Sequence, residues 1–175
     1  MISNNLQSLL YCLLNKKFFT LLTIIIFIIS CSNIEKIKEE HALENIISEY
    51  NRLLIEANKT RNLEPLKKIA DESVVKKLEL WMAAWEDGNA SMDTELKSLN
   101  FDSIKITGNN ARVKTTEDWS FEYRDLDTKK ILSPKESIHY EMEYILVKKE
   151  GRWLITKINI LKEAHRGREW VKDNF

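Results

Sequence analysis

Hydrophobic positions between residues 42 and 57 recur at steps of three and four residues, which is the spacing of one face of an α-helix. Glutamates and other polar residues, among them Asn45 and Arg52, occupy the positions between them. This pattern predicts a long helix from about Ile34 to Asn58, ended by the polar stretch 59–62. The apolar face consists of Ala42, Leu43, Ile46, Ile47, Tyr50, Leu53, Leu54 and Ala57.

Two more helices are predicted before the pattern changes. A short one lies near Leu63 to Ile69, with Pro65 in its first turn, where proline is tolerated. Asp71 has the chemistry of an N-cap for a third helix over about Glu72 to Trp85. The segment 87–89, with its central glycine, predicts the end of that helix.

From Leu96 onward, apolar and polar residues alternate with a period of two, which is typical of strands with one buried face. We predict a first strand around 104–106, a second over 111–123, a third over 138–146 and a fourth over 153–161. The connections between them are Gly108-Asn109-Asn110, the polar segment Asp125 to Pro134, and Lys149-Glu150-Gly151-Arg152.

The order of these elements predicts an α+β fold in which three N-terminal helices pack on a curved antiparallel sheet of about four strands. A curved sheet can wrap a long helix and leave a pocket between the two. With only 4 glycines and 2 prolines, the composition argues against a disordered or loop-rich chain. We therefore expect a single domain over residues 37–162.

The N-terminal segment has the order of a secretory signal peptide, in which positive charge precedes an apolar run and a small residue. Lys16 and Lys17 supply the charge, Phe18 to Ile29 the apolar run, and Ser30 the small residue before Cys31. This arrangement resembles the lipobox of bacterial lipoproteins. It predicts a signal peptide over 1–30, a lipidated Cys31 and a short tether over 31–36. The alternative is an uncleaved anchor, although the run is shorter than the ~20 apolar residues of a spanning helix.

Lipidation by palmitate or a related acyl chain would place the domain on the extracytoplasmic side of a membrane in the cell envelope. Cys12 would leave with the signal peptide and Cys31 would carry the lipid, so no thiol would be left for a disulfide or a metal site. Ser32 is not the aspartate that resembles an inner-membrane retention signal, which favours the outer membrane if the cell has two.

Charge and motifs limit the classes of function. The chain has 27 basic and 27 acidic residues, which gives no general attraction to nucleic acid. His41, His139 and His165 do not have the spacing of metal ligands, and neither a phosphate-binding loop nor a nucleophile–base motif is present. We expect no cofactor, no metal and no nucleic-acid partner.

Several short segments carry a resemblance to the nuclear transport factor 2-like, or cystatin-like, superfamily. They are Glu49-Tyr50-Asn51, Asn62-Leu63-Glu64-Pro65-Leu66, Ala70-Asp71, Ala111-Arg112-Val113 to Trp119, His139 to Leu146, and Gly151-Arg152-Trp153-Leu154-Ile155. The resemblance implies a cone-shaped, cystatin-like arrangement of helices and sheet. This fold hosts isomerases, cyclases, assembly factors and binding modules, so it does not choose between functions.

Within that superfamily, the chain also resembles the intermembrane-space domain of chloroplast-division proteins and their cyanobacterial relatives. The shared features are Trp119-x-Phe121-x-Tyr123, Ser133-Pro134, Tyr140-x-x-x-Tyr144 and Gly151-Arg152-Trp153. The resemblance covers roughly Asn45 to Leu161. It implies a domain that binds partner proteins and does not catalyse a reaction.

Eight aromatic side chains are candidates for a pocket that binds a ligand or a partner, although aromatic residues at helix and strand spacing also form plain cores. Three residues are weaker catalytic candidates: His139 and Asp118 on the polar phase of their strands, and Glu117 on the aromatic phase. The basic, aromatic segment 163–175 is predicted to be a loose tail. The eight candidates are Trp81, Trp85, Trp119, Phe121, Tyr123, Tyr140, Tyr144 and Trp153.

Our leading hypothesis is a membrane-anchored, non-catalytic module that binds a protein partner or an apolar ligand in the envelope. One alternative is a small enzyme of the isomerase or cyclase type that uses a carboxylate or histidine in the sheet cavity. Another is a subunit that assembles an envelope or secretion system.

Overall fold

The computed structural model describes residues 34–169. The predicted signal peptide, Cys31 and the last residues of the predicted tail lie outside them. The chain divides into two compact units, Met1–Ala42 and Leu43–Phe175; the start of the first helix belongs to the first unit, and the sheet, α2 and the cavity belong to the second. No helix in the described range is both long and apolar enough to cross a membrane.

The first predicted helix covers residues 34–60. Its end is marked by Arg61, whose backbone is left-handed (φ 62°) and whose amide donates to the carbonyl of Ala57 at 2.8 Å. Most of the predicted apolar face is buried, and Leu43 and Ile47 have no exposed surface. The half-buried positions of this face are Ala42, Ile46 and Leu54. Hydrophobic periodicity was therefore sufficient to define this helix.

The prediction of three N-terminal helices is wrong: among residues 34–169, two α-helices precede the sheet, and the segment predicted as the second helix forms only one short 3₁₀ turn of five residues, η1 (Glu64–Lys68). Hydrogen bonds fix both ends of η1. The side chain of Asn62 accepts a hydrogen bond from the amide of Glu64 at 3.1 Å, and Ile69 pairs with the backbone of Ile155 in the sheet. A segment this short closes with the tighter 3₁₀ turn, which is used in short pieces.

The remaining helix, α2 (Glu72–Asp87), begins at the predicted N-cap, because the side chain of Asp71 accepts a hydrogen bond from the amide of Ser73 at 3.2 Å. It buries Val74, Val75 and Met82. In the described range, two α-helices thus precede the sheet. The α+β class and the curved sheet remain.

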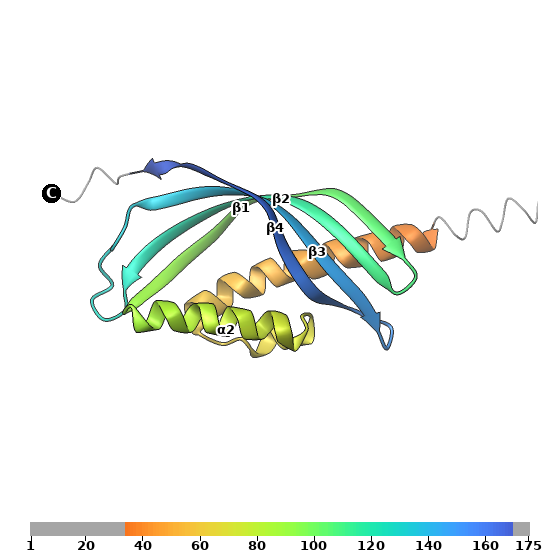
Figure 1. The fold of residues 1–175 in the computed structure, drawn as a ribbon, viewed down its shortest axis with the longest axis horizontal. Helices are drawn as coiled ribbons and strands as arrows, with labels where there is room; N and C mark the ends of the chain where they lie inside the picture. Colours follow the sequence, from red (N-terminus) through yellow and green to blue (C-terminus); the bar gives the residue numbers. More distant parts are fainter. Residues whose placement is uncertain (1–33, 170–175) are drawn as a thin grey trace, which may run out of the picture. The chain divides into compact units, whose positions relative to one another are not determined.

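The sheet is an antiparallel meander in the order β1-β2-β3-β4, made of four long strands. Residues 43–60 of the first helix and α2 lie on the same side of it (Figure 1). Any cavity between the helices and the strands is therefore bounded by the side chains that point inward from both. The strands are β1 (Ala90–Thr107), β2 (Asn110–Asp125), β3 (Lys135–Lys149) and β4 (Arg152–Glu169).

All four strands extend beyond their predicted bounds, and β1 and β4 do so the most. β1 begins at Ala90, and irregularities between Leu96 and Ser98 and between Phe101 and Ser103 shift its inward phase twice. β4 continues to Glu169, so the segment predicted as a tail begins inside a strand that pairs with β3. Strand pairing, not local composition, orders this part of the chain.

A hydrophobic core joins the first helix, η1, the start of α2 and one end of the sheet. Tyr144 lies within it, with its ring edge-on to that of Tyr50 at 6.1 Å between centroids. Trp153 is also part of this core, with 5% of its surface exposed. The core therefore holds both helices against the strands and fixes the position of the space beside it.

Candidate functional site

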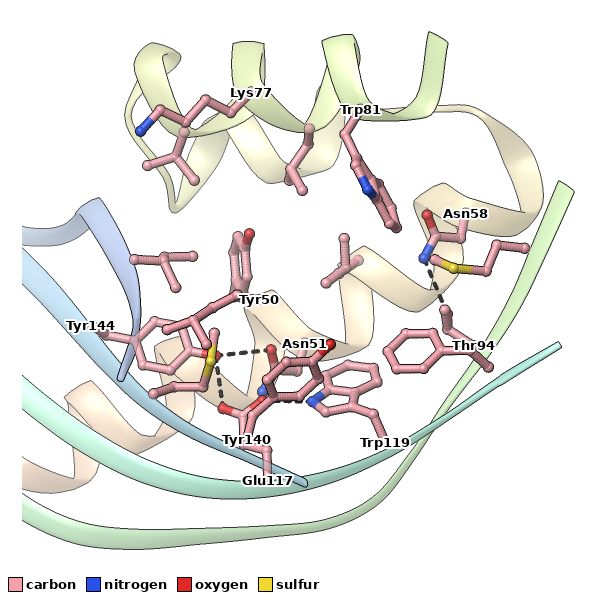
Figure 2. A pocket seen from close by; sticks show the side chains of 18 of the residues that line it. Tyr50, Asn51, Asn58, Lys77, Trp81, Thr94, Glu117, Trp119, Tyr140 and Tyr144 are labelled. Carbon is pink, nitrogen blue, oxygen red and sulfur yellow. Dashed lines mark hydrogen bonds between the residues drawn. The ribbon is translucent and has the colours of Figure 1, made fainter. Parts of the chain in front are cut away.

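A cavity of about 430 Å³ lies between the first helix, α2 and the inner face of the sheet. This volume is within the range of small-molecule sites, ~300–1,000 Å³. Figure 2 shows Glu117, Asn51 and Tyr144 close together near the strands, with Lys77 and Trp81 on α2 at the opposite side. The cavity thus has a polar end beneath a largely apolar space.

Five of the eight predicted aromatic residues line the cavity: Trp81, Trp119, Phe121, Tyr140 and Tyr144. The rings of Trp119 and Phe121 stack with 6.2 Å between centroids, and together they form a flat apolar wall. Sequence periodicity alone could not separate these residues from core aromatics.

The other three predicted aromatics are not among the lining residues. The ring of Trp85 lies 4.6 Å from that of Tyr123 and 6.2 Å from that of Trp81, so Trp85 and Tyr123 support the cavity wall from outside. Trp153 belongs to the core, with the ammonium of Lys148 5.6 Å from its ring.

The polar end of the cavity is built around Glu117, whose side chain is 1% exposed. Alternation along β2 places Thr115, Glu117 and Trp119 on the same inner face. Glu117 Oε1 accepts hydrogen bonds from the hydroxyls of Thr115 and Tyr144, each at 2.8 Å, and Oε2 accepts from Trp119 Nε1 at 2.7 Å. These donors compensate the burial of a carboxylate.

Burial keeps the cavity tyrosines protonated. Desolvation raises the pKa of Tyr144 well above its usual value, and the charge of Glu117 and its hydrogen bond add to the shift. The pKa of Tyr50 is raised by burial and then by Glu117. Burial, Glu163, Tyr123 and Glu136 raise the pKa of Tyr140 to about 12. All three hydroxyls are donors at physiological pH.

Two buried asparagines on the first helix were missed by the sequence reasoning. Asn51 and Asn58 are 1% and 6% exposed and both line the cavity. Asn58 Nδ2 donates to the hydroxyl of Thr94 at 3.1 Å. The two residues are seven positions apart and continue the apolar face, so polar residues at apolar helix positions were the signal that could have revealed them.

Exposed lining residues mark where the cavity opens. Trp81 and Ile160 are 40% and 57% exposed, and Lys77 and Lys157 are also exposed. Two of these residues belong to α2 and two to β4. The mouth therefore lies between α2 and β4 and carries two lysines.

The histidine candidate lies on the other face of the sheet. His139 Nδ1 is 2.8 Å from Asp118 Oδ1, and the hydroxyl of Ser98 donates to Asp118 Oδ2 at 2.8 Å. None of these residues lines the cavity. His165 Nε2 is 2.9 Å from Glu163. Within residues 34–169, no group of three or more His, Cys, Asp or Glu side chains could hold a metal ion.

Comparison with solved structures gives a similarity to the intermembrane space region of the chloroplast protein ARC6, known from a crystal structure. The two share 22% sequence identity with a TM-score of 0.61, over 69% of this chain and 95% of that one. No protein-family model matches the chain, and no curated protein matches it. The likeness confirms the predicted resemblance to that domain, and at this identity it supports the fold alone.

Proposed function

We propose that this protein is a lipid-anchored envelope module whose cavity binds an apolar ligand without catalysing a reaction. The observation that carries the proposal is the 430 Å³ cavity with aromatic walls and a few convergent polar groups. Such a combination provides affinity through apolar burial and orientation through hydrogen bonds.

The state of Glu117 favours binding over catalysis. A catalytic base needs a lone pair directed at the proton it removes. Three donors take most of the roughly four lone-pair sites of the Glu117 carboxylate, and two of them come from neighbours on its own strand. We interpret Glu117 as the group that orders the polar end of the cavity.

The position of the domain in the cell is proposed from the sequence. The signal-peptide pattern before Cys31 supports export and lipidation, and the likeness to an intermembrane-space region agrees with a domain outside the cytoplasm. The nuclear transport factor 2-like, cystatin-like fold class is likewise proposed from the resemblance. We propose the outer membrane as the site of the anchor if the cell has two.

Replacing Cys31 with alanine is expected to abolish acylation, because the acceptor thiol is lost. Cells grown with radioactive palmitate should label the wild-type protein and not Cys31→Ala. Cys12→Ala should label normally, since Cys12 lies within the predicted signal peptide. Continued labelling of Cys31→Ala would refute the anchor.

Filling the cavity is expected to prevent ligand binding. Leu78 lines the cavity from α2, and a tryptophan at this position would occupy part of its volume. A photoactivatable lauric acid, irradiated with the full chain in isolated membranes, should crosslink to cavity residues of the wild-type protein. We expect Leu78→Trp to reduce this crosslinking at least about tenfold, as mass spectrometry of the labelled peptides would show.

The matched control is Leu80→Trp, on the same helix. Leu80 is 61% exposed and does not line the cavity, so labelling should be unchanged. Equal labelling in wild type and Leu78→Trp, or labelling only outside the cavity, would show that the probe binds elsewhere.

A second candidate function is a small isomerase- or cyclase-type enzyme, favoured by the 2.8 Å contact between Glu117 and the protonated Tyr144 in an apolar cavity. Its histidine version would have to use His139, which lies on the opposite face of the sheet. The proposals of a protein partner and of an assembly subunit rest on the resemblance in sequence. Crosslinking in intact cells would identify such a partner.

A further inference from the structure

The amide of Asn51 at the polar end of the cavity is only partly paired. Its side chain is 1% exposed, and Nδ2 has no hydrogen-bond partner among residues 34–169. Buried side-chain amides almost always have partners, and those that do not usually have a specific explanation. Because Asn51 lines the cavity, a bound molecule can supply the missing partner.

A partner that can both donate and accept suits either orientation of the Asn51 amide. The Tyr144 hydroxyl lies 2.8 Å from Glu117 Oε1 and 3.3 Å from Asn51 Oδ1, and its single proton serves the shorter contact. A hydroxyl oxygen can also accept, so the Asn51 amide can turn either its oxygen or its nitrogen toward Tyr144. The free end is then a donor in one orientation and an acceptor in the other.

Glu117 restricts the charge of this partner. Its carboxylate and the Asn51 amide both contact the Tyr144 hydroxyl, so a group that reaches Asn51 also comes near a buried negative charge. A second carboxylate there would be repelled in a medium of low dielectric. A neutral hydroxyl avoids this repulsion and satisfies either orientation of the amide.

The mouth of the cavity, unlike its buried end, favours a negatively charged group. Lys77 and Lys157 line the mouth from α2 and β4, and neither forms an ion pair with another described residue. Among residues 34–169, Glu117 is the only acidic residue that lines the cavity, and it lies at the buried end. An anionic group at the mouth would therefore meet positive charge without a competing carboxylate.

We propose that the ligand is an apolar molecule with a hydroxyl at its buried end, bound by Asn51, and an anionic group at the mouth, beside Lys77 and Lys157. This inference rests on the proposed function, because it names the class of molecule that the same cavity takes.

The test uses competition against the photoactivatable lauric acid, with the full chain in isolated membranes. The competitors are ω-hydroxylauric acid, lauric acid and the diol of the same length. We expect ω-hydroxylauric acid to displace the probe at about tenfold lower concentration than lauric acid, because one hydrogen bond is gained at the buried end. The diol, which lacks the charge, should compete severalfold more weakly than ω-hydroxylauric acid.

Matched variants assign each end. Asn51→Leu should remove the preference for the ω-hydroxyl while lauric acid still competes, and Asn45→Leu, exposed on the same helix, should keep the preference. In the double variant Lys77→Gln/Lys157→Gln, ω-hydroxylauric acid should no longer compete better than the diol. Lys76→Gln, exposed on α2 and outside the cavity, should not.

The outcomes separate the two proposals. If the probe labels the cavity but lauric acid and ω-hydroxylauric acid compete with it equally well in the wild-type protein, this inference is overturned and the proposed function stands. If Asn51→Leu keeps the full preference, Asn51 does not bind the hydroxyl and the inference also fails. If no probe labels the cavity, the proposed function fails with it.

Discussion

Stability of the fold is expected to fall steeply above pH 10, by at least about 3 kcal/mol for each pH unit from the two most buried tyrosines. Unfolding exposes Tyr50 and Tyr144, which then lose their protons near the ordinary pKa of 10, whereas burial and Glu117 hold both pKa values higher in the fold. Above pH 10 the unfolded state therefore binds fewer protons than the folded state. The stabilisation that comes from each raised pKa is fully present below pH 10. Between pH 10 and the folded pKa, each tyrosine lowers the free energy of unfolding by about 1.4 kcal/mol per pH unit.

Urea denaturation of the full chain at a series of pH values between about 8 and 11.5 measures this slope. Tyr50→Phe removes one of these groups and should reduce the slope by about 1.4 kcal/mol per pH unit, whereas Tyr140, whose pKa is also raised, contributes alike in both proteins. Lysines also titrate in this range, but equally in both proteins, so the difference between the slopes isolates the tyrosine. Identical slopes for wild type and Tyr50→Phe would contradict the assignment.

Removing the acceptor at the polar end is expected to destabilise the fold by about 3 kcal/mol or more. In Glu117→Leu, the donors of Thr115 and Trp119 lose their acceptor while they stay buried, and the Tyr144 hydroxyl keeps only the longer contact to Asn51 Oδ1 at 3.3 Å. A buried donor without an acceptor costs about 1–3 kcal/mol, and part of the total is offset because the buried charge is removed. The free energy of unfolding from urea titration at neutral pH gives the value.

A double-mutant cycle tests whether the effect arises from the network. Tyr144→Phe should cost less in the Glu117→Leu background than in wild type, with a coupling energy of about 1 kcal/mol or more. Glu141→Leu is the control, since Glu141 pairs with Lys162 on the exposed face and should change stability by about 0.5 kcal/mol or less. Additive costs in the cycle would mean that Glu117 and Tyr144 act independently.

The sequence predicted those elements that their own residues specify. The first helix follows from its apolar face, and α2 begins at Asp71 because the side chain accepts the amide of Ser73. The strong alternation over 111–123 identified β2 and also placed Glu117 on the inner face with Trp119. In these places local pattern and tertiary packing agree.

Elements determined by distant contacts could not be predicted in this way. The backbone bonds from 69–71 to Ile155 fix the end of η1, and no local signal reports them. The irregularities in β1 reverse the phase of its inward residues, so alternation beginning at Ala90 is broken near Leu96. The end of β4 is ordered by pairing with β3.

The candidate site was predicted only in part, because it too depends on contacts between distant segments. Aromatic residues were identified as a group, but only the packed structure shows that Trp81 and Trp119 line the cavity while Trp85 and Trp153 do not. The pairing of Glu117 with Tyr144 joins β2 to β3 and depends on strand register. Asn51 was visible only as a polar residue on an apolar helix face.

The most direct test of a ligand-binding cavity is the extraction of non-covalently bound molecules from the full chain, purified from its own membranes, followed by mass spectrometry. We predict a molecule present in stoichiometric amount in wild type and in Leu80→Trp, and lost from Leu78→Trp. The same molecules in the same amounts from all three proteins would contradict the proposal that the cavity binds a ligand.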